Sequence, residues 1–266
     1  MIGYISYFKT QIVTNLQYKV AAIAGLCTQF FWGFLYVMIY QAFYSHADNS
    51  TINFPDLVTY VWLNQAMFAL IYIRMKDNDI LNSIKTGTVA YELCRPYDLY
   101  NWWYIKMLAK KYAAVALRFL PIIIVSLLLP APYALGLPQS SLSFILFLVA
   151  LILGSFVLVS ILMIIQSITF FTYHEGGISQ ILFLIAELLA GAFLPLPLMP
   201  DIVQKISYYL PFRLVGDLPF RIYSGNVCIN DALINVMFQC IWIVVLILIG
   251  KCIMKFALKR VVIQGG

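Results

Sequence analysis

The sequence predicts an all-α integral membrane protein, and three observations support this fold class. Of the 266 residues, 63% are hydrophobic and only 11% carry a charged side chain, whereas a soluble domain carries about a quarter. The mean hydropathy is +0.90. Several charge-free runs also approach or exceed the length of about twenty residues that a helix needs to cross a bilayer. We therefore expect a single membrane domain with about six transmembrane helices and no separate catalytic domain.

Residues 1–19 are predicted to form an amphipathic helix that lies in the membrane interface. Ile5, Phe8, Ile12 and Leu16 fall at helical spacing, and polar side chains occupy the remaining faces. This pattern is typical of a helix with one apolar face in lipid. The same periodicity also allows a plain extension of the first transmembrane helix.

Six apolar segments are the predicted transmembrane spans. They are residues 20–44, 57–73, 112–129, 142–173, 178–194 and 232–250. The distribution of positive charge predicts their orientation. Lys205, Arg213 and Arg221 fall on the outer side, Arg118 lies within the third span, and the rest of the 17 Lys and Arg residues fall on the side of the N-terminus. Both termini are therefore expected in the cytoplasm.

Residues 74–106 form a polar island, the longest stretch of the chain that cannot lie in lipid. Charged side chains are spread along its whole length. Asp77, Asn78 or Asp79 can cap a short helix there, and Gly87 stands where such a helix would end in the left-handed conformation. This island is the expected cytoplasmic element between the second and third spans.

One face of that short helix is apolar and is formed by Ile80, Leu81 and Ile84. We expect this face to be exposed, and an exposed apolar face rimmed by charge suggests a protein partner. Residues 88–93 favour β structure, and Asp98 can cap the helix that leads into the third span. An ordinary solvated loop is the alternative interpretation of the whole island.

Residues 195–226 form a second unusual region, on the outer side. Five prolines prevent a single transmembrane helix, yet the segment is too apolar for a free loop. Asp201 is expected to cap a short helix that runs to Leu210, and a second short helix is expected to end near Gly225. Irregular backbone at membrane depth is tolerated only where protein or a wet cavity covers it. We therefore expect two re-entrant helices that dip back toward the sixth span.

Two charged residues stand inside predicted spans, Arg118 in the third and Glu187 in the fifth. A charge at the centre of a membrane helix costs about 2.5–3.5 kcal/mol on insertion scales, so each should face protein, water or the other charge. We name Gln29, Arg118 and Glu187 as candidates for a transport pathway. Small residues near Gln29 and Glu187 would let two permeases approach along spans one, two and five, although packing within one chain explains them equally. The aromatic residues of the first span suit a greasy cargo or contact with lipid.

The stretch at residues 84–96, IKTGTVAYELCRP, resembles a pattern found between the second and third spans of ABC-2 type exporter permeases. The match is closest to a little-characterised branch of that family with the stretch I-x-x-G-x-x-x-Y-x-L-x-R-P. The outer region is also similar, through residues 191–195, 210–212 and 219–225. With six spans and an N-terminal interfacial helix, the similarity covers essentially the whole chain.

This resemblance implies the permease subunit of an ATP-driven exporter. In such transporters the cytoplasmic element between spans two and three sits in a groove of a nucleotide-binding subunit. The contacts implied here are Asp77, Asp79, Ile80, Leu81, Ile84, Lys85, Gly87 and Arg95, with a smaller second contact at His174 and Glu175 between spans four and five. The chain has no GxxxxGK[ST] phosphate loop, so ATP and Mg²⁺ are expected on the partner ATPase.

The resemblance also implies the remaining partners and the location. A second permease, identical or a sister paralogue, is expected to face this chain in the bilayer of a bacterial plasma (inner) membrane. The cargo is expected to be hydrophobic or amphiphilic: a lipid, lipopeptide, antimicrobial peptide or drug. No basic cluster on a soluble aromatic face indicates nucleic-acid binding, and no metal site is expected.

Other functional classes fit the sequence less well. A membrane enzyme needs clustered His, Asp, Glu or Cys, but His46 and His174 are predicted on opposite sides of the membrane. A channel or ion-driven carrier would place several ionisable residues near the midplane, whereas only Arg118 and Glu187 lie inside predicted spans here. An accessory membrane subunit without ATPase coupling stays open as an alternative.

Overall fold

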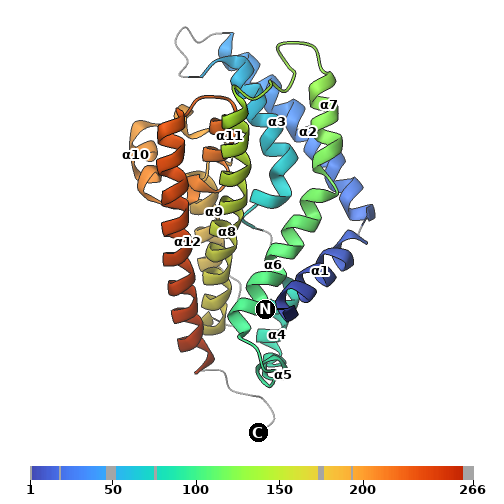
Figure 1. Ribbon diagram of the computed structural model, residues 1–266, viewed down its shortest axis with the longest axis vertical. Helices are drawn as coiled ribbons and strands as arrows, with labels where there is room; N and C mark the ends of the chain where they lie inside the picture. The colour runs from blue at the N-terminus through green and yellow to red at the C-terminus, as the bar shows by residue number, and fades with distance from the viewer. Residues whose placement is uncertain are drawn as a thin grey trace.

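The computed structural model describes residues 2–17, 19–45, 52–74, 77–172, 177–192 and 194–259, and this part of the chain folds into helices without a β-strand (Figure 1). The helices are α1 Ile2–Leu16, α2 Lys19–Tyr44, α3 Phe54–Ile71, α4 Asn78–Lys85, α5 Val89–Leu93, α6 Leu99–Ala116, α7 Phe119–Leu128, α8 Ser141–Thr172, α9 Gly177–Leu189, α10 Asp201–Tyr209, α11 Asp217–Tyr223 and α12 Ile229–Leu258, with short 3₁₀ turns η1 Leu196–Leu198 and η2 Phe212–Leu214. The predicted all-α fold class is confirmed.

Among the described residues, four helical stretches are long and apolar enough to cross a membrane. They are Lys19–Tyr44, Leu99–Leu128, Ser141–Ile168 and Ile229–Leu258. The predicted second and fifth spans correspond to α3 and α9. Helix α3 has 18 residues that include Asp56, Asn64 and Gln65, and α9 has only 13 residues. The count of six spans therefore stays a prediction.

The helix of the predicted third span begins much earlier than residue 112, within the polar island. Asp98 caps α6, because its Oδ1 accepts a hydrogen bond from the backbone N–H of Asn101 at 2.8 Å. The helix then breaks at Arg118, between α6 and α7. Pro121 explains the break, since a proline lacks the N–H that would bond the carbonyl of Leu117 and its ring clashes with that carbonyl.

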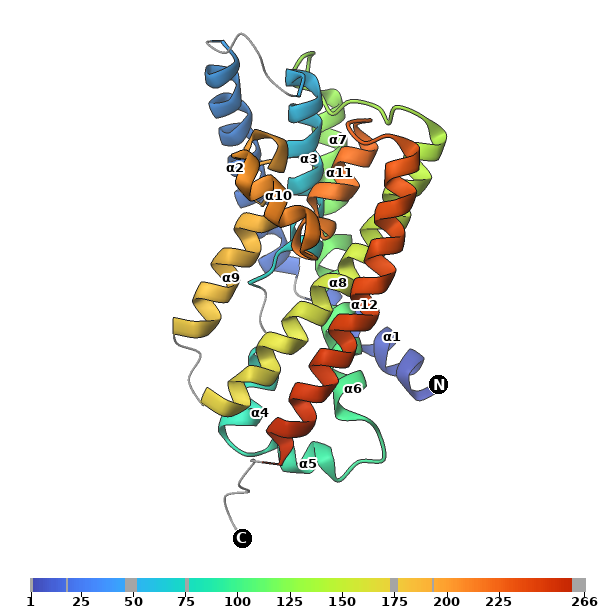
Figure 2. The same cartoon turned by 90° about the vertical axis from the view of Figure 1, so that its left-hand side faces the viewer.

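Helices α8 and α12 pack along each other and form the longest contact in the fold (Figure 2). Gln239 of α12 lies at their junction with η2, where its Nε2 donates to the carbonyls of Ala150 and Leu214 at 2.8 Å each. Gly154 of α8 allows this close approach, because a Cβ there would lie 2.8 Å from the carbonyl oxygen of Val215. The segment after α10 is thus fixed against the long helices.

The outer region contains the two short helices that the prolines and polar residues predict, α10 and α11. Asp201 does not cap α10 as expected: it is the first helical residue, and Pro200 holds the cap position. Asp217, which is fully buried, joins the region to the rest of the fold. Its carboxylate accepts from the backbone N–H of Leu196 at 3.2 Å and lies 3.3 Å from the hydroxyl of Tyr60 on α3. Re-entry into the bilayer stays a prediction.

Helix α1 is a separate element that packs against α6. The indole of Trp102 stacks on the ring of Tyr7 at 3.7 Å and on that of Tyr97 at 4.2 Å. Because α1 ends at Leu16 and α2 begins at Lys19, α1 does not extend the first span. Its position in the membrane interface stays a prediction.

Candidate transport cavity and coupling surface

Asp77 fixes the start of α4 through two kinds of contact. Its Oδ1 accepts from the backbone N–H groups of Asp79 and Ile80 at 3.1 Å each. The same carboxylate forms ion pairs with Lys106 at 3.1 Å and Lys110 at 3.5 Å. Burial alone would raise the pKa of the Asp77 carboxyl, but Lys106, Lys110 and the Ile80 N–H outweigh it, so the pKa lies below its ordinary value of 3.8. The side chain of Asp77 is only 1% exposed. It therefore bonds within the chain and is not accessible to a partner protein.

The apolar face of α4 is buried, which corrects the expectation that it is exposed. Ile80, Leu81 and Ile84 are 2%, 3% and 6% exposed. Ile80 and Ile84 belong to a core cluster that includes Met107 of α6 and Leu162 of α8. The prediction was wrong because α6 begins at Leu99, so its first turns, together with α8, cover this face of α4.

Residues 88–93, which were expected to favour β structure, contain the short helix α5. Gly87 precedes it with a φ of 72°, which agrees with the left-handed conformation that the sequence predicts. Glu92 is held by the indole N–H of Trp103, which donates to its Oε2 at 2.6 Å. This bond fixes α5 on the first turns of α6.

The exposed side of α4, α5 and the following turn is called the coupling surface below. It consists of Asp79, Lys85, Tyr91, Leu93 and Arg95, all of which are exposed. Tyr91, the aromatic side chain of this group, is 76% exposed. His174 and Glu175, the expected second contact, lie outside the described residues.

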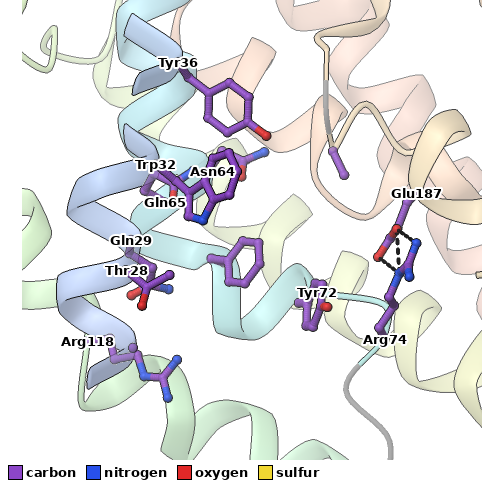
Figure 3. A pocket seen from close by; sticks show the side chains of 13 residues that line it. Thr28, Gln29, Trp32, Tyr36, Asn64, Gln65, Tyr72, Arg74, Arg118 and Glu187 are labelled. Carbon is purple, nitrogen blue, oxygen red and sulfur yellow. Dashed lines mark hydrogen bonds and ion pairs between the residues drawn. The ribbon is translucent and has the colours of Figure 1, made fainter. Parts of the chain in front are cut away.

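A cavity of about 510 Å³ lies between α2, α3, α9 and the break between α6 and α7 (Figure 3). The three residues predicted as pathway candidates, Gln29, Arg118 and Glu187, all line it. Aromatic side chains form much of the wall, among them Trp32 and Tyr72. The cavity therefore combines apolar ring surfaces with a few polar groups, as small-molecule sites generally do.

Glu187 is paired with Arg74, which sequence reasoning had assigned to the cytoplasmic island. The guanidinium Nε lies 2.8 Å from both carboxylate oxygens, and one terminal nitrogen lies 2.8 Å from Oε2. The carboxylate is buried, whereas the Arg74 side chain is about one third exposed. The pair therefore ties the end of α3 to α9 inside the cavity wall.

Arg118 points from the helix break toward α2. One of its terminal nitrogens donates to the carbonyl of Ala21 at 3.3 Å. The guanidinium occupies the space where a side chain on Gly25 would stand, since a Cβ there would lie 2.5 Å from Arg118 Cζ. Arg118 forms no ion pair with another described residue. Gly25 is one of the small residues near Gln29 that would let two permeases approach, and the Arg118 guanidinium gives it a packing reason within one chain.

Gln29 is the most unusual polar residue of the cavity. It is 4% exposed, and neither its amide nitrogen nor its amide oxygen has a hydrogen-bond partner among the described residues. Sequence reasoning did not identify Asn64 and Gln65, which also line the cavity. Their signal was visible, because two adjacent amides interrupt the otherwise apolar run of the second predicted span.

Comparison with known protein families gives a match over most of the chain. The profile of the ABC-2 family transporter proteins matches residues 26–265. A search of curated proteins gives no match. The family match covers nearly the entire chain, including the coupling surface, the outer helices and all of the cavity lining except Gly25. The chain therefore belongs to the ABC-2 family of transporter proteins, the multi-pass membrane permeases of ABC transporters.

Proposed function

We propose that this chain is the permease of an ATP-driven exporter whose ATP and Mg²⁺ are bound by a separate nucleotide-binding subunit. The observation that carries the proposal is that the cavity and the coupling surface are separated by only a few residues of the chain. Arg74, which pairs with Glu187 in the cavity, stands three residues before Asp77, which anchors α4. A displacement of α4 would therefore act directly on the cavity wall.

The coupling surface is the part of the chain that we assign to the partner ATPase. The core contacts of Ile80 and Ile84 and the ion pairs of Asp77 fasten α4 to α6 and α8. Because α4 is packed against α6 and α8, a movement of α4 that the partner ATPase causes would also move these two membrane helices. Tyr91, Leu93 and Arg95 offer an aromatic, an aliphatic and a cationic contact for the partner, and Tyr and Arg are enriched at interface hot spots.

The proposed orientation places α1, α4 and α5 on the cytoplasmic side of a bacterial plasma membrane. These helices and the C-terminal end of α12 lie toward the same end of the molecule (Figure 1). Most Lys and Arg residues belong to this end, as the positive-inside rule requires of a cytoplasmic face. Both termini are then cytoplasmic.

A second permease, identical or a sister paralogue, is proposed to face the cavity. Helices α2 and α9, which line the cavity, also carry large exposed apolar side chains, including Phe31 and Met38 on α2 and Ile181 and Ile185 on α9. A partner permease would cover part of this apolar surface and complete the wall of a path for a hydrophobic or amphiphilic cargo.

The test is co-purification of the chain with an ABC ATPase encoded by a neighbouring gene, followed by assay of ATP hydrolysis in nanodiscs. Tyr91→Ala on α5 is compared with Tyr209→Ala on α10, because both side chains are 76% exposed. We expect Tyr91→Ala to weaken ATPase binding about tenfold or more, as loss of an aromatic interface anchor does. Tyr209→Ala should leave binding unchanged.

Two outcomes would contradict this proposal. If no ATPase co-purifies with the unaltered chain, the accessory-subunit alternative is favoured. If both tyrosine variants weaken the complex equally, the ATPase does not bind at the coupling surface. Labelling of a cysteine introduced at Lys85 from outside the cell would also overturn the proposed orientation.

A further inference from the structure

Arg118 brings a positive charge to the cavity that no carboxylate of the described chain neutralises. Its partner is the carbonyl of Ala21, and its Nε has no hydrogen-bond partner among the described residues. The other charged side chains of the cavity wall, Arg74 and Glu187, neutralise each other. Two cations and one carboxylate leave the lining with one net positive charge, located at Arg118.

The surroundings of Arg118 are built to hold the guanidinium in place. Pro121 breaks the helix so that Arg118 turns toward α2, and Gly25 leaves the space that the guanidinium fills. Figure 3 places Arg118 at one end of the cavity and the Arg74–Glu187 pair at the other. The free positive charge therefore lies at a defined end of the site.

Gln29 supplies a second and independent indication of a ligand. Its side chain lies in the cavity wall one helical turn from Gly25, which the Arg118 guanidinium contacts. Both amide atoms are buried and without a partner among the described residues. An unpaired buried amide is costly, so its retention is explained by a ligand that accepts from its Nε2.

The rest of the cavity suits an apolar body. The rings of Trp32, Tyr36, Phe68 and Tyr72 line it. A volume of about 510 Å³ lies within the range of about 300–1,000 Å³ of small-molecule sites. The lining therefore offers a cation and an amide donor for a head group and aromatic surface for a chain.

We propose that the cavity binds an anionic amphiphile, with an oxyanion head group at Arg118 and Gln29 and its apolar chain against the aromatic wall. The inference rests on the proposed transport function, because it names the charge class of the cargo. A carboxylate and a phosphate head share the required chemistry, since both accept charge-assisted hydrogen bonds from a guanidinium.

The test measures binding by the full chain alone, in phosphatidylcholine nanodiscs at about pH 7.5, where a carboxylate is ionised. Four probes of equal chain length are titrated by calorimetry, with empty nanodiscs subtracted: dodecanoate, dodecyl phosphate, dodecanol and dodecyltrimethylammonium. We expect dodecanoate, dodecyl phosphate or both to bind at least about tenfold more tightly than the neutral and cationic probes. The stronger of the two anions identifies the head group.

Three variants assign the effect to the site. Arg118→Gln should weaken binding of the anions about tenfold or more and leave dodecanol binding unchanged. Gly25→Ala retains the charge but displaces the guanidinium, so it should weaken anion binding as well. Lys205→Gln removes an exposed cation of α10, away from the cavity, and should change nothing.

The inference is overturned if the cationic probe binds as tightly as the anions, or if Arg118→Gln weakens all four probes equally. Its failure is separable from that of the proposed function, because no ATPase is present in the binding assay. Anion binding that depends on Arg118 without any ATPase partner would retain the site and reject ATP-driven export. ATPase coupling with binding that ignores Arg118 would do the reverse.

Discussion

The cavity and the α4 region differ in whether their polar side chains have partners. In the α4 region the buried Asp77 carboxylate has two backbone donors and two lysines. In the cavity, the buried Gln29 amide has no hydrogen-bond partner and Arg118 has no carboxylate partner within the described part of the chain. Buried polar groups in proteins are almost always satisfied. The difference supports the proposal that the cavity binds a ligand, whereas contacts within the chain hold the α4 region in place.

This comparison also changes which residues of the α4 region bear on function. The residues predicted as partner contacts divide into a buried set, Asp77, Ile80 and Ile84, and an exposed set represented by Asp79 and Arg95. The buried set makes α4 stiff, and only the exposed set is accessible to another protein. Experiments on coupling should therefore alter the exposed set and use the buried set as a measure of folding.

The largest expected effect comes from placing a charge in the buried face of α4. Ile80→Asp should prevent folding or lower the free energy of unfolding by more than about 4 kcal/mol, because the carboxylate would lose water without gaining a partner. Leu93→Asp, at a side chain that is 43% exposed, should cost less than about 1 kcal/mol. Yield of monodisperse protein and the thermal unfolding midpoint in detergent provide the measurement.

Equal loss of folded protein in both variants would contradict the division of the α4 region into a buried and an exposed side. Retention of folding in Ile80→Asp would restore the sequence-based expectation that this face is exposed.

The second effect concerns the carboxylate at the start of α4. Asp77→Asn keeps the shape of the side chain and its capping oxygen but leaves Lys106 and Lys110 without this counter-charge. We expect a loss of about 2 kcal/mol, less than for a fully buried pair, because the two lysines retain contact with water. Asp79→Asn, at a side chain that is 80% exposed, should change stability by less than about 0.5 kcal/mol. Thermal unfolding of the matched pair decides between these values.

Sequence patterns predicted the helices well because helix ends and apolar runs are local features. A cap among Asp77, Asn78 and Asp79, the cap at Asp98, the left-handed Gly87, and the long apolar helices α8 and α12 all follow from residues close together in the chain. The burial of Ile80 did not follow, because it depends on where α6 begins and on contact with α8. Likewise, Glu187 could be recognised as costly in a membrane, but its partner Arg74 lies 113 residues away.

The pathway residues show the same limit. Gln29, Arg118 and Glu187 were each identifiable as polar residues in apolar runs, but their convergence on one cavity requires the packing of α2, α3 and α9 around the break between α6 and α7. Pro121 was a local signal of the helix break that directs Arg118 to that cavity.

A smaller effect is expected from acid. The lowered pKa of Asp77 means that its ionised form stabilises the folded state. This contribution is complete above the ordinary value of 3.8 and is lost as the pH falls from there through the lower folded pKa. The difference in unfolding midpoint between the unaltered chain and Asp77→Asn should therefore shrink as the pH falls below about 4. Midpoints measured from about pH 7 to pH 2.5 test this, and a difference that stays constant over the whole range would show that the charge of Asp77 is not its source.

The smallest expected effect on stability separates a buried glutamine whose Nε2 donates two hydrogen bonds, Gln239, from one that makes none among the described residues, Gln29. Gln239→Leu removes two hydrogen bonds, to the carbonyls of Ala150 and Leu214, and should cost about 1–2 kcal/mol. Gln29→Leu removes an amide that has no partner among the described residues. It should be neutral or slightly stabilising, within about 1 kcal/mol, because an unpaired polar group leaves a buried position. Thermal unfolding in the absence of ligand measures both.

The same two variants then distinguish a structural amide from a binding one. If the cavity binds the anion, Gln29→Leu should retain full stability and lose affinity for whichever of dodecanoate and dodecyl phosphate binds more tightly. Gln239→Leu should instead lose stability and retain that affinity. A destabilised Gln29→Leu protein would mean that this amide is already satisfied in the folded chain. The contrast between the α4 region and the cavity would then no longer hold, because the buried polar groups of both would have partners within the chain.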